Sequence, residues 1–182
     1  MRKLIVFNQT SIDGYIADAA GDMSWAHRSD PEWNAFVAGN AGSDGELLFG
    51  RTTYDQMASF WPTPMAAQQM PDVARGINAA SKIVFSRTLT HASWNNTKIV
   101  SGDLVAELRK RKSEPGSPMV VMGSASIVAQ LAALVDEFQL VVNPIALGGG
   151  KNMFTGIRGH LPLTLSSSRV FKNGNVLLTY AR

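Results

Sequence analysis

The chain has 182 residues, of which 45% are apolar, and this suits one domain with a sizeable core. It contains no cysteine, which excludes disulfides, zinc–thiolate sites and cysteine nucleophiles. The formal net charge is +3, but the one basic cluster, residues 109–112, lies at the end of a predicted helix, where cations interact favourably with the helix dipole. We therefore expect a single domain over residues 1–182 with no nucleic-acid partner.

The first apolar run, within MRKLIVFNQTSIDGY, is only about as long as a strand. A secretion signal or a membrane span would need a longer apolar segment. We therefore expect a cytoplasmic protein with no membrane partner.

Strand-like and helix-like patterns alternate along the chain. Ser29-Asp30-Pro31 is a helix-start signal, and Asn173-Gly174 between two alternating runs predicts a hairpin. In chain order, the expected elements are a strand at 4–9, a long irregular loop at 10–28, a helix to about residue 41, a strand at 45–49, a helix from about 52 that ends near prolines 62 and 64, strands at 81–86 and 97–101, a helix at 103–112, a strand–glycine–helix unit at 117–134, a long strand at 137–147, and two strands flanking 172–175.

This alternation predicts an α/β fold of three layers, with a mostly parallel central sheet and helices on both faces. The closing hairpin adds antiparallel strands at one edge. In such sheets, ligands bind beyond the carboxyl ends of the strands. Three strand exits are therefore of interest: Phe49-Gly50-Arg51, Phe85-Ser86-Arg87 and Met122-Gly123-Ser124.

The first exit, "FGRTT", has a glycine followed by an arginine and two threonines. A helix N-terminus offers free N–H groups and a positive dipole end, and Gly50 lets the backbone approach an anion closely. Arg51 adds a guanidinium that matches phosphate geometry, and Thr52 and Thr53 add hydroxyl donors. The segment predicts a phosphate site; the alternative is that Thr52 only caps the helix and Arg51 is exposed.

The other two exits repeat this chemistry. Ser86 and Arg87 follow a strand, although an ordinary polar loop could contain the same residues. At the third exit, a helix begins with the small residues Gly123, Ser124, Ala125 and Ser126. They lack the full G-x-G-x-x-G pattern that is usual in dinucleotide-binding folds. Three such exits on one edge favour an extended ligand with several phosphates, such as NADPH, with Arg51 and Arg87 on the extra phosphate of its adenosine ribose.

Four motifs, in their order and spacing, resemble the dihydrofolate-reductase-like superfamily over essentially the whole chain. They are "SIDGYIA" at 11–17, "FGRTTYDQM" at 49–57, "VFSRTL" at 84–89 and the block at 120–154. Within the superfamily, the chain most resembles the reductase domain of the bifunctional riboflavin-pathway deaminase–reductases and their stand-alone relatives. The family usually has two consecutive glycines at the third exit. This chain has Met122 and Gly123 there, and the side chain of Met122 would hinder a close backbone approach.

The resemblance implies an NADPH-dependent reductase that transfers hydride from C4 of the nicotinamide to a pyrimidine- or pterin-like ring. The best-known substrate of the riboflavin relatives is a ribosylamino-pyrimidine phosphate. In this family the first two exits would bind the phosphates, and the third would approach the pyrophosphate. The backbone around Gln9, Ile16 and Ala17 would receive the nicotinamide carboxamide.

The substrate side is predicted around "DMSWAHRSDPEW", residues 22–33. Folate reductases carry an aromatic residue in a loop and an acidic residue at the next helix start, a pair that Trp25 and Asp30 resemble. Asp30 would then hydrogen-bond an amino-pyrimidine edge and assist proton delivery, or it would only cap the helix. Further candidates for substrate binding, each with a purely structural alternative, are Asp13, Trp61, Gly149 and Lys151.

Two other functions stay open: dihydrofolate reductase activity, which needs Asp30 in the pterin pocket, and an NADP-binding protein that has lost catalysis. The three histidines show no metal-ligand spacing, so no metal site is expected. The resemblance also implies a homodimer in which the strand at 137–147 pairs subunits.

Overall fold

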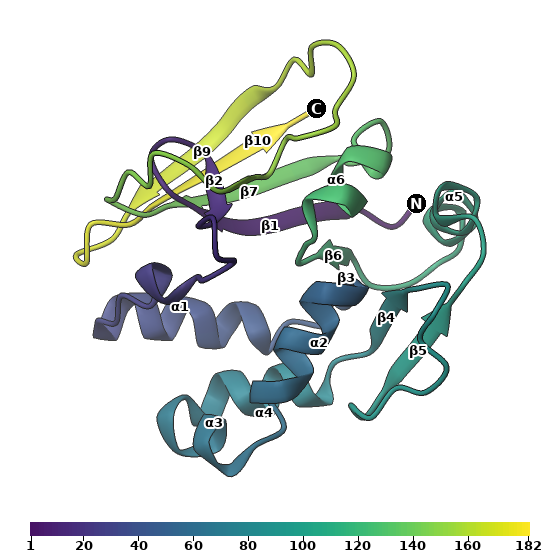
Figure 1. Cartoon of the computed structure of the whole chain (residues 1–182), viewed down its shortest axis with the longest axis horizontal. Helices are drawn as coiled ribbons and strands as arrows, with labels where there is room; N and C mark the ends of the chain where they lie inside the picture. The colour runs from purple at the N-terminus through teal and green to yellow at the C-terminus, as the bar shows by residue number, and fades with distance from the viewer.

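The computed structural model describes residues 1–182 and is built around an eight-stranded sheet in the order β5-β4-β3-β6-β1-β7-β10-β9 (Figure 1). Strands β5, β4, β3, β6, β1 and β7 pair in parallel, and β10 pairs antiparallel with both β7 and β9. The predicted mostly parallel sheet with a closing antiparallel hairpin is confirmed. The strands of this sheet are β1 (Leu4–Thr10), β3 (Glu46–Gly50), β4 (Lys82–Phe85), β5 (Thr97–Val100), β6 (Met119–Val121), β7 (Glu137–Val142), β9 (Thr164–Val170) and β10 (Val176–Ala181).

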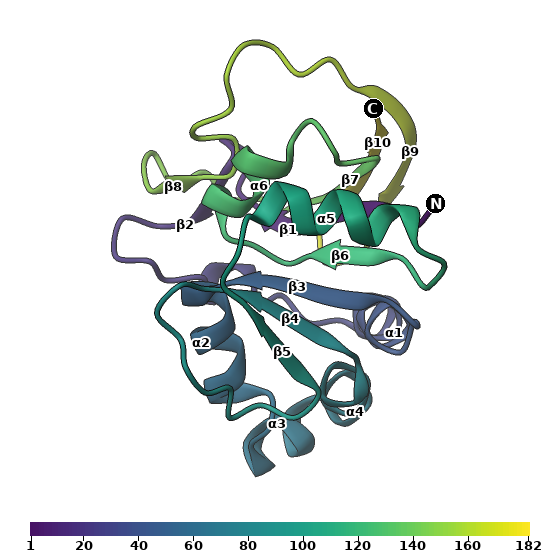
Figure 2. The ribbon, with the colours of Figure 1, turned by 90° about the vertical axis from the view of Figure 1, so that its right-hand side faces the viewer.

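Helices cover both faces of the sheet, which gives the three predicted layers (Figures 1 and 2). α1, α2 and α4 lie on one face, and α5 and α6 lie on the other. No helix has the length and apolar character that crossing a membrane requires. The helices are α1 (Pro31–Ala41), α2 (Arg51–Phe60), α3 (Pro64–Gln69), α4 (Pro71–Ala79), α5 (Leu104–Ser113) and α6 (Ala125–Leu131), with a short 3-10 helix η1 (Ser24–Ala26).

The core forms on the two faces because strand side chains alternate. Along β1, Leu4 and Val6 are fully buried under α5 and α6, while the residues between them face the other side. On the opposite face, Phe49, Tyr54 and Trp94 form a second cluster beneath α2 and α4. Burial on both faces explains why the central strands are nearly continuous apolar runs.

Two expectations about element length were wrong. The strand expected at 137–147 ends at Val142. Its ladder with β1 closes with the bond from Asn143 N–H to Thr10 O at 2.7 Å, because Pro144 has no N–H and restricts the residue before it. The loop expected at 10–28 contains η1 and the strand β2 (Tyr15–Ala17), which pairs with β8 (Lys151–Asn152). Such a short pairing leaves too weak a pattern to be recognised in the sequence.

The closing hairpin forms one edge of the sheet. Its turn is fixed by a hydrogen bond from Phe171 N–H to Asn175 O at 2.9 Å, and Gly174 adopts the positive φ that the turn requires. Every residue of β9 is exposed. β7 is already paired with β1 and β10 within the chain, so the homodimer expected through it stays a prediction.

Candidate functional site

The neighbouring strands β3 and β6 are followed by helices on opposite faces of the sheet. β3 leads into α2, which packs on the cluster of Phe49 and Tyr54, whereas β6 leads into α6, which packs on the cluster of Leu4 and Val6 (Figure 2). Open α/β sheets bind ligands beyond the carboxyl ends of strands that diverge in this way. We call this position the switch point, and the first and third predicted exits flank it.

The two exits touch at a pair of glycines. Gly50 N–H donates to Gly123 O at 3.0 Å. A Cβ on Gly50 would lie 2.8 Å from Ser124 Oγ, and a Cβ on Gly123 would lie 3.1 Å from Thr53 Oγ1. Gly123 also has a φ of +122°, which other residues rarely adopt. A side chain at either glycine would therefore crowd its neighbours at the switch point, while the approach of an anion to Gly50 stays a prediction.

The N-terminus of α2 has no side-chain cap. Gly50 is the N-cap residue, and Thr52 is an exposed residue inside the first turn, so the alternative in which Thr52 caps the helix is wrong. The first-turn N–H groups and the positive end of the dipole remain available to an anion. This is the arrangement that binds phosphate at helix N-termini.

Arg51 connects the first exit to the second. Its Nη1 donates to Thr88 Oγ1 at 3.3 Å, and its Nε pairs with Asp55 at 2.7 Å. This ion pair is about half exposed on both sides, so it holds the guanidinium only weakly. Ser86 Oγ accepts hydrogen bonds from the N–H groups of Thr88 and Leu89. Ser86 thereby closes a local turn, as expected if this segment is an ordinary polar loop. Arg51 is thus free to turn toward a ligand.

The third exit opens α6 with small, partly exposed residues. Ser124 is the N-cap, its Oγ lies 2.8 Å from Ser126 Oγ, and Ala125 begins the helix. Met122 is half-buried and packs against the cluster that contains Phe49. The core therefore takes up the side chain that stands in place of the usual glycine.

The predicted carboxamide-binding residues lie at the end of β1 and on β2. Gln9 Oε1 accepts from Asn143 Nδ2 at 3.3 Å, and Ile16 packs against the core. Ala17 pairs with Lys151 across the β2–β8 ladder. In the order of the main sheet, β1 is separated from β3 by β6 alone, so Gln9 lies near the switch point, whereas Ile16 and Ala17 belong to the separate β2–β8 pair.

Asn8 was not among the predicted site residues, although it also lies at the switch point. This residue is 7% exposed, and its Nδ2 is buried without a hydrogen-bond partner. It lies within the first apolar run, where a single amide is easily taken for a half-buried strand residue. A polar residue facing a core cluster near a strand exit was the signal available in the sequence.

On the predicted substrate side, the carboxylate of Asp30 binds backbone groups. Its Oδ1 accepts the N–H groups of Glu32 and Trp33 at 2.8 and 3.1 Å, and its Oδ2 accepts Asn173 N–H at 3.1 Å. Arg28 and Asn173 exchange two further hydrogen bonds, which fix the hairpin turn beside the start of α1. Asp30 is the helix cap, and its role toward a substrate stays a prediction.

Asp13 joins the loop after β1 to the turn after β7. Its carboxylate accepts the Ser11 hydroxyl at 2.6 Å and the N–H groups of Gly148 and Leu147 at 2.7 and 3.1 Å. The Ser11 bond and then the two backbone bonds lower the pKa of Asp13 to about 2, so it is an anion at neutral pH. The turn role of Asp13 is present, and it extends across two loops.

The remaining candidates lie in three different places. Gly149 and the exposed Lys151 lie directly after the turn whose Leu147 and Gly148 N–H groups bind Asp13. Trp25 lies in η1 and donates its indole N–H to Asp22 O at 3.1 Å. Trp61 lies at the far end of α2, roughly 16 Å from Gly50 at 1.5 Å per residue, and packs into the core with its indole N–H donating to Met57 Sδ. The structure therefore does not bring Trp61 to the strand exits.

Comparison with known proteins relates this site to a family. The family model of the RibD C-terminal domain matches residues 2–177. The chain belongs to the RibD C-terminal domain family. The uncharacterized protein YyaP of Bacillus subtilis (strain 168) is 26% identical over 181 residues, which cover 98% of this chain and 94% of YyaP. The family expected from the four motifs is confirmed.

Solved structures share the fold of this RibD C-terminal domain. A protein of Shewanella sp. PV-4 named for riboflavin biosynthesis has a TM-score of 0.71 at 24% identity, over 99% of this chain and 98% of its own. The Thermotoga maritima diaminohydroxyphosphoribosylaminopyrimidine deaminase/5-amino-6-(5-phosphoribosylamino)uracil reductase has a TM-score of 0.69 at 15% identity, over 99% of this chain and 56% of its own. Enterococcus faecalis dihydrofolate reductase, complexed with NADP(H), has a TM-score of 0.64 at 13% identity, over 99% of this chain and 96% of its own. The predicted dihydrofolate-reductase-like fold is confirmed.

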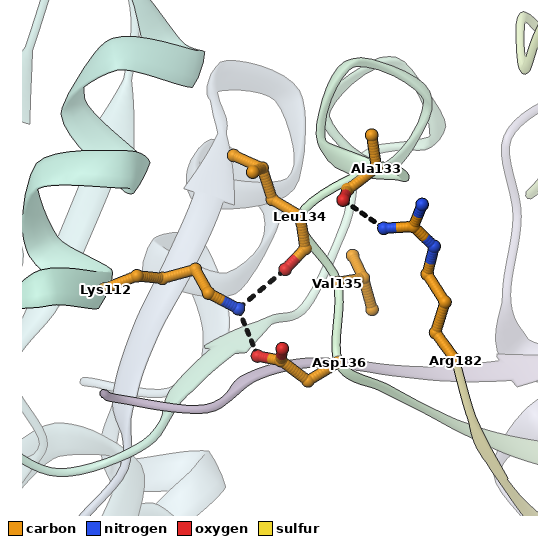
Figure 3. A pocket seen from close by; sticks show the side chains of 6 residues that line it. All are labelled: Lys112, Ala133, Leu134, Val135, Asp136 and Arg182. Carbon is orange, nitrogen blue, oxygen red and sulfur yellow. Dashed lines mark hydrogen bonds and ion pairs between the residues drawn. The ribbon is translucent and has the colours of Figure 1, made fainter.

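A cavity of about 480 Å³ in this RibD C-terminal domain lies at the opposite, amino edge of the sheet (Figure 3). There Lys112 donates to Leu134 O at 2.8 Å and pairs with Asp136, and Arg182 donates to Ala133 O. Asp136 also accepts the N–H that opens β1 at 2.7 Å. Because the charged groups bind one another or the backbone, this cavity is a structural junction.

Proposed function

We propose that this protein is an NADPH-dependent reductase that transfers hydride to a pyrimidine- or pterin-like ring, of the type reduced in riboflavin synthesis. The observation that carries the proposal is the switch point, where two glycines without room for a side chain adjoin the uncapped N-terminus of α2. Two of the structural neighbours are reductases by name, and one of them was solved with NADP(H). Their likeness supports the fold, and the residues of this chain support the ligand.

The residues at the three exits fit the phosphates of a dinucleotide. The first-turn N–H groups of α2 and the hydroxyl of Thr53 face the switch point, where a pyrophosphate would approach the glycines. Arg51 reaches toward the β4 exit, where Arg87 is exposed. Two guanidinium groups at that end would bind the additional phosphate that distinguishes NADPH from NADH.

The bound cofactor would supply the hydride, and the chain would supply orientation and exclusion of water. Gln9, Ile16 and Ala17, at the end of β1 and on β2, would hold the nicotinamide end against the substrate. On the substrate side, Lys151 and the backbone around Gly149 would receive a substrate phosphate. The anionic Asp13 orders that turn by binding Gly148 N–H.

Titration of NADPH and NADH by intrinsic tryptophan fluorescence tests the proposal. We expect the wild type to prefer NADPH, and Arg51→Ala and Arg87→Ala each to weaken NADPH about 10- to 100-fold while NADH changes little, because each removes a charge-assisted contact to one phosphate. Arg75→Ala is the matched control, since Arg75 forms a similar exposed ion pair with Asp72 on α4. Absence of nucleotide binding by the wild type, or equal affinity for NADPH and NADH in all variants, would contradict the proposal.

The substrate class needs a separate measurement of NADPH oxidation. We expect oxidation with 5-amino-6-ribosylamino-uracil phosphate to exceed oxidation with dihydrofolate, since the carboxylate that a folate reductase would use is here bound to three backbone N–H groups. Faster turnover of dihydrofolate would favour the folate reaction instead.

A further inference from the structure

Gln9 presents an unused hydrogen-bond donor at the carboxyl end of β1. The residue is half-buried, its Oε1 accepts from Asn143 Nδ2 at 3.3 Å, and its Nε2 binds no group of the chain. Unlike the enclosed amide atoms of Asn143 and Asn175, Gln9 Nε2 keeps accessible surface. A ligand atom can therefore reach this donor.

Asn143 fixes the orientation of the Gln9 amide. Asn143 Nδ2 also donates to Thr10 O and Val141 O, both at 3.3 Å, so turning its amide over would set Oδ1 against two carbonyl oxygens. If the Gln9 amide turned over instead, its Nε2 would face Asn143 Nδ2, donor against donor. Asn143 is fully buried, so no ligand replaces it as the partner of Gln9. Gln9 thus offers a ligand its N–H₂ group and not its carbonyl.

Gln9 lies on the face of the sheet that α1 covers. Side chains two residues apart on a strand share a face, and Phe7 packs against the cluster that contains Trp33 of α1. Asp30 caps the same helix, and its carboxylate, the acceptor that a folate reductase would use, is bound to three backbone N–H groups. On this side of the sheet the chain therefore offers a free donor, while that acceptor is occupied.

We propose that Gln9 Nε2 donates to a carbonyl of the substrate ring, at the ring position where an amino-pyrimidinone or a pterin carries an amino group. A pyrimidinedione accepts a hydrogen bond there, whereas an amino group would face Nε2 donor against donor. This inference rests on the proposed function, and it names the side chain that selects the ring. The backbone of β1 would meet the cofactor, and the side chain of Gln9 would meet the ring that receives the hydride.

Two ligands that differ at this one ring position test the inference. They are 5-amino-6-ribosylamino-uracil phosphate and its analogue with an amino group in place of the 2-carbonyl. Calorimetric titration of each into the protein saturated with NADP⁺ measures binding alone, because NADP⁺ has no hydride to transfer. We expect the wild type to bind the pyrimidinedione about tenfold or more tightly than the amino analogue, because the analogue loses one hydrogen bond and leaves two donors unpaired.

Gln9→Glu exchanges the donor for an acceptor and keeps an oxygen for Asn143. At about pH 8, where the introduced carboxylate is an anion, we expect it to bind the pyrimidinedione about 10- to 100-fold more weakly than the wild type and the amino analogue more tightly. A purely structural role of Gln9 would not move the two affinities in opposite directions. Affinity for NADPH should stay within about twofold of the wild type, because the backbone is unchanged.

Gln9→Leu removes the donor without adding an acceptor, and it keeps the test decisive should the glutamate variant not fold. Asn143 Nδ2 retains Thr10 O and Val141 O in this variant. We expect the affinity for the pyrimidinedione to fall about three- to tenfold and the preference over the amino analogue to disappear. Gln68→Glu is the matched control, because it makes the same change at an exposed amide on α3.

Each other outcome overturns a defined statement. If the folded Gln9 variants keep the preference of the wild type, or weaken both ligands equally, the assignment of Gln9 is wrong and the proposed function stands. If the wild type with NADP⁺ binds neither ligand, the proposed substrate class is wrong, and the assignment of Gln9 is wrong with it. If the wild type binds no nicotinamide nucleotide, the proposed function itself is wrong.

Discussion

The amino ends and the carboxyl ends of the parallel strands, here called the amino edge and the carboxyl edge of the sheet, differ in what their polar groups contact. At the amino edge, Lys112, Asp136 and Arg182 bind one another or backbone carbonyls around the cavity of Figure 3. At the carboxyl edge, α2 has no side-chain cap, the Nδ2 of Asn8 has no partner, and the side chain of Arg51 is 43% exposed. The charged groups around the cavity are therefore satisfied, whereas the groups at the candidate site are not, although Thr97 Oγ1 at the start of β5 is a further buried atom without a partner.

This contrast shows why volume alone is a poor guide to function. A polar group that is already satisfied must lose a hydrogen bond before it binds a ligand, so its net gain is small. An unsatisfied group already lost its hydration when the chain folded, so a hydrogen bond to a ligand contributes its full free energy to binding. Three predictions test this division between the edges.

The largest effect is expected from filling the switch point. Gly123→Ala places a Cβ 3.1 Å from Thr53 Oγ1 on a residue with a φ of +122°. We expect the free energy of unfolding to fall by about 1 to 3 kcal/mol, the usual range for such backbone strain. We also expect NADPH affinity to fall about tenfold or more, as measured by titration alongside urea denaturation.

Gly102→Ala is the control for this substitution, because a Cβ there would meet no atom within 4 Å and its φ is not positive. Its unfolding free energy should stay within about 0.5 kcal/mol of the wild type. Equal effects of the two substitutions would mean that the switch point has no special need for glycine.

A smaller effect is expected at the amino edge. Asp136→Ala removes the acceptor for Leu4 N–H and the partner of Lys112. We expect the free energy of unfolding to fall by about 1 to 2 kcal/mol, since the carboxylate is partly exposed, and NADPH affinity to be unchanged. A folded Asp136→Ala protein that no longer bound NADPH would contradict the structural role of this edge.

The last prediction concerns a pH dependence from Lys82, which opens β4 at the same edge. Its ammonium group donates to three backbone carbonyls and lies 4.6 Å from the Trp94 ring centroid, yet burial lowers the pKa of Lys82 from 10.5 to about 8. Between these values the unfolded state holds more protons than the folded state, so the contribution of Lys82 to stability rises with pH. Below about pH 8 both states are charged, and the folded state bears the full cost of burial.

Urea denaturation of wild type and Lys82→Met at several values between pH 7.5 and 10.5 measures this effect, since the difference between the two proteins removes the titration of all other groups. We expect the wild type to gain stability relative to the variant as pH rises. A difference that stays constant over this range would show that the three carbonyls keep Lys82 charged in the folded state.

Much of the fold was predictable because local patterns and tertiary packing agree. The apolar run at 4–9, the cap at Asp30 with Pro31 and the Asn173-Gly174 turn each carry a local signal, and each forms the expected element. The helices α3 and α4 were not predicted, because their lengths of six and nine residues, each beginning at a proline, resemble a broken loop. Their place in the fold depends on packing across the second cluster.

The site was predictable only where chemistry is local. The glycines and Arg51 follow strands directly, so their positions at the sheet edge came from topology. That Arg51 reaches Thr88, 37 positions later, depends on the pairing of β3 with β4 and has no local signal. The orphan amide of Asn8 could not be foreseen either, because whether an amide finds a partner depends on every neighbour that packs around it.

The segment from Asp18 to His27 is fixed at both ends. Before it, β2 pairs with β8, and after it Arg28 and Asn173 exchange hydrogen bonds at 3.1 and 2.8 Å. Lengthening a surface segment between fixed ends costs little free energy, so the length of this segment can vary without disturbing the sheet. Under the proposed function, a change in the length of this segment would alter the substrate side and leave the strand exits that would bind the nucleotide in place.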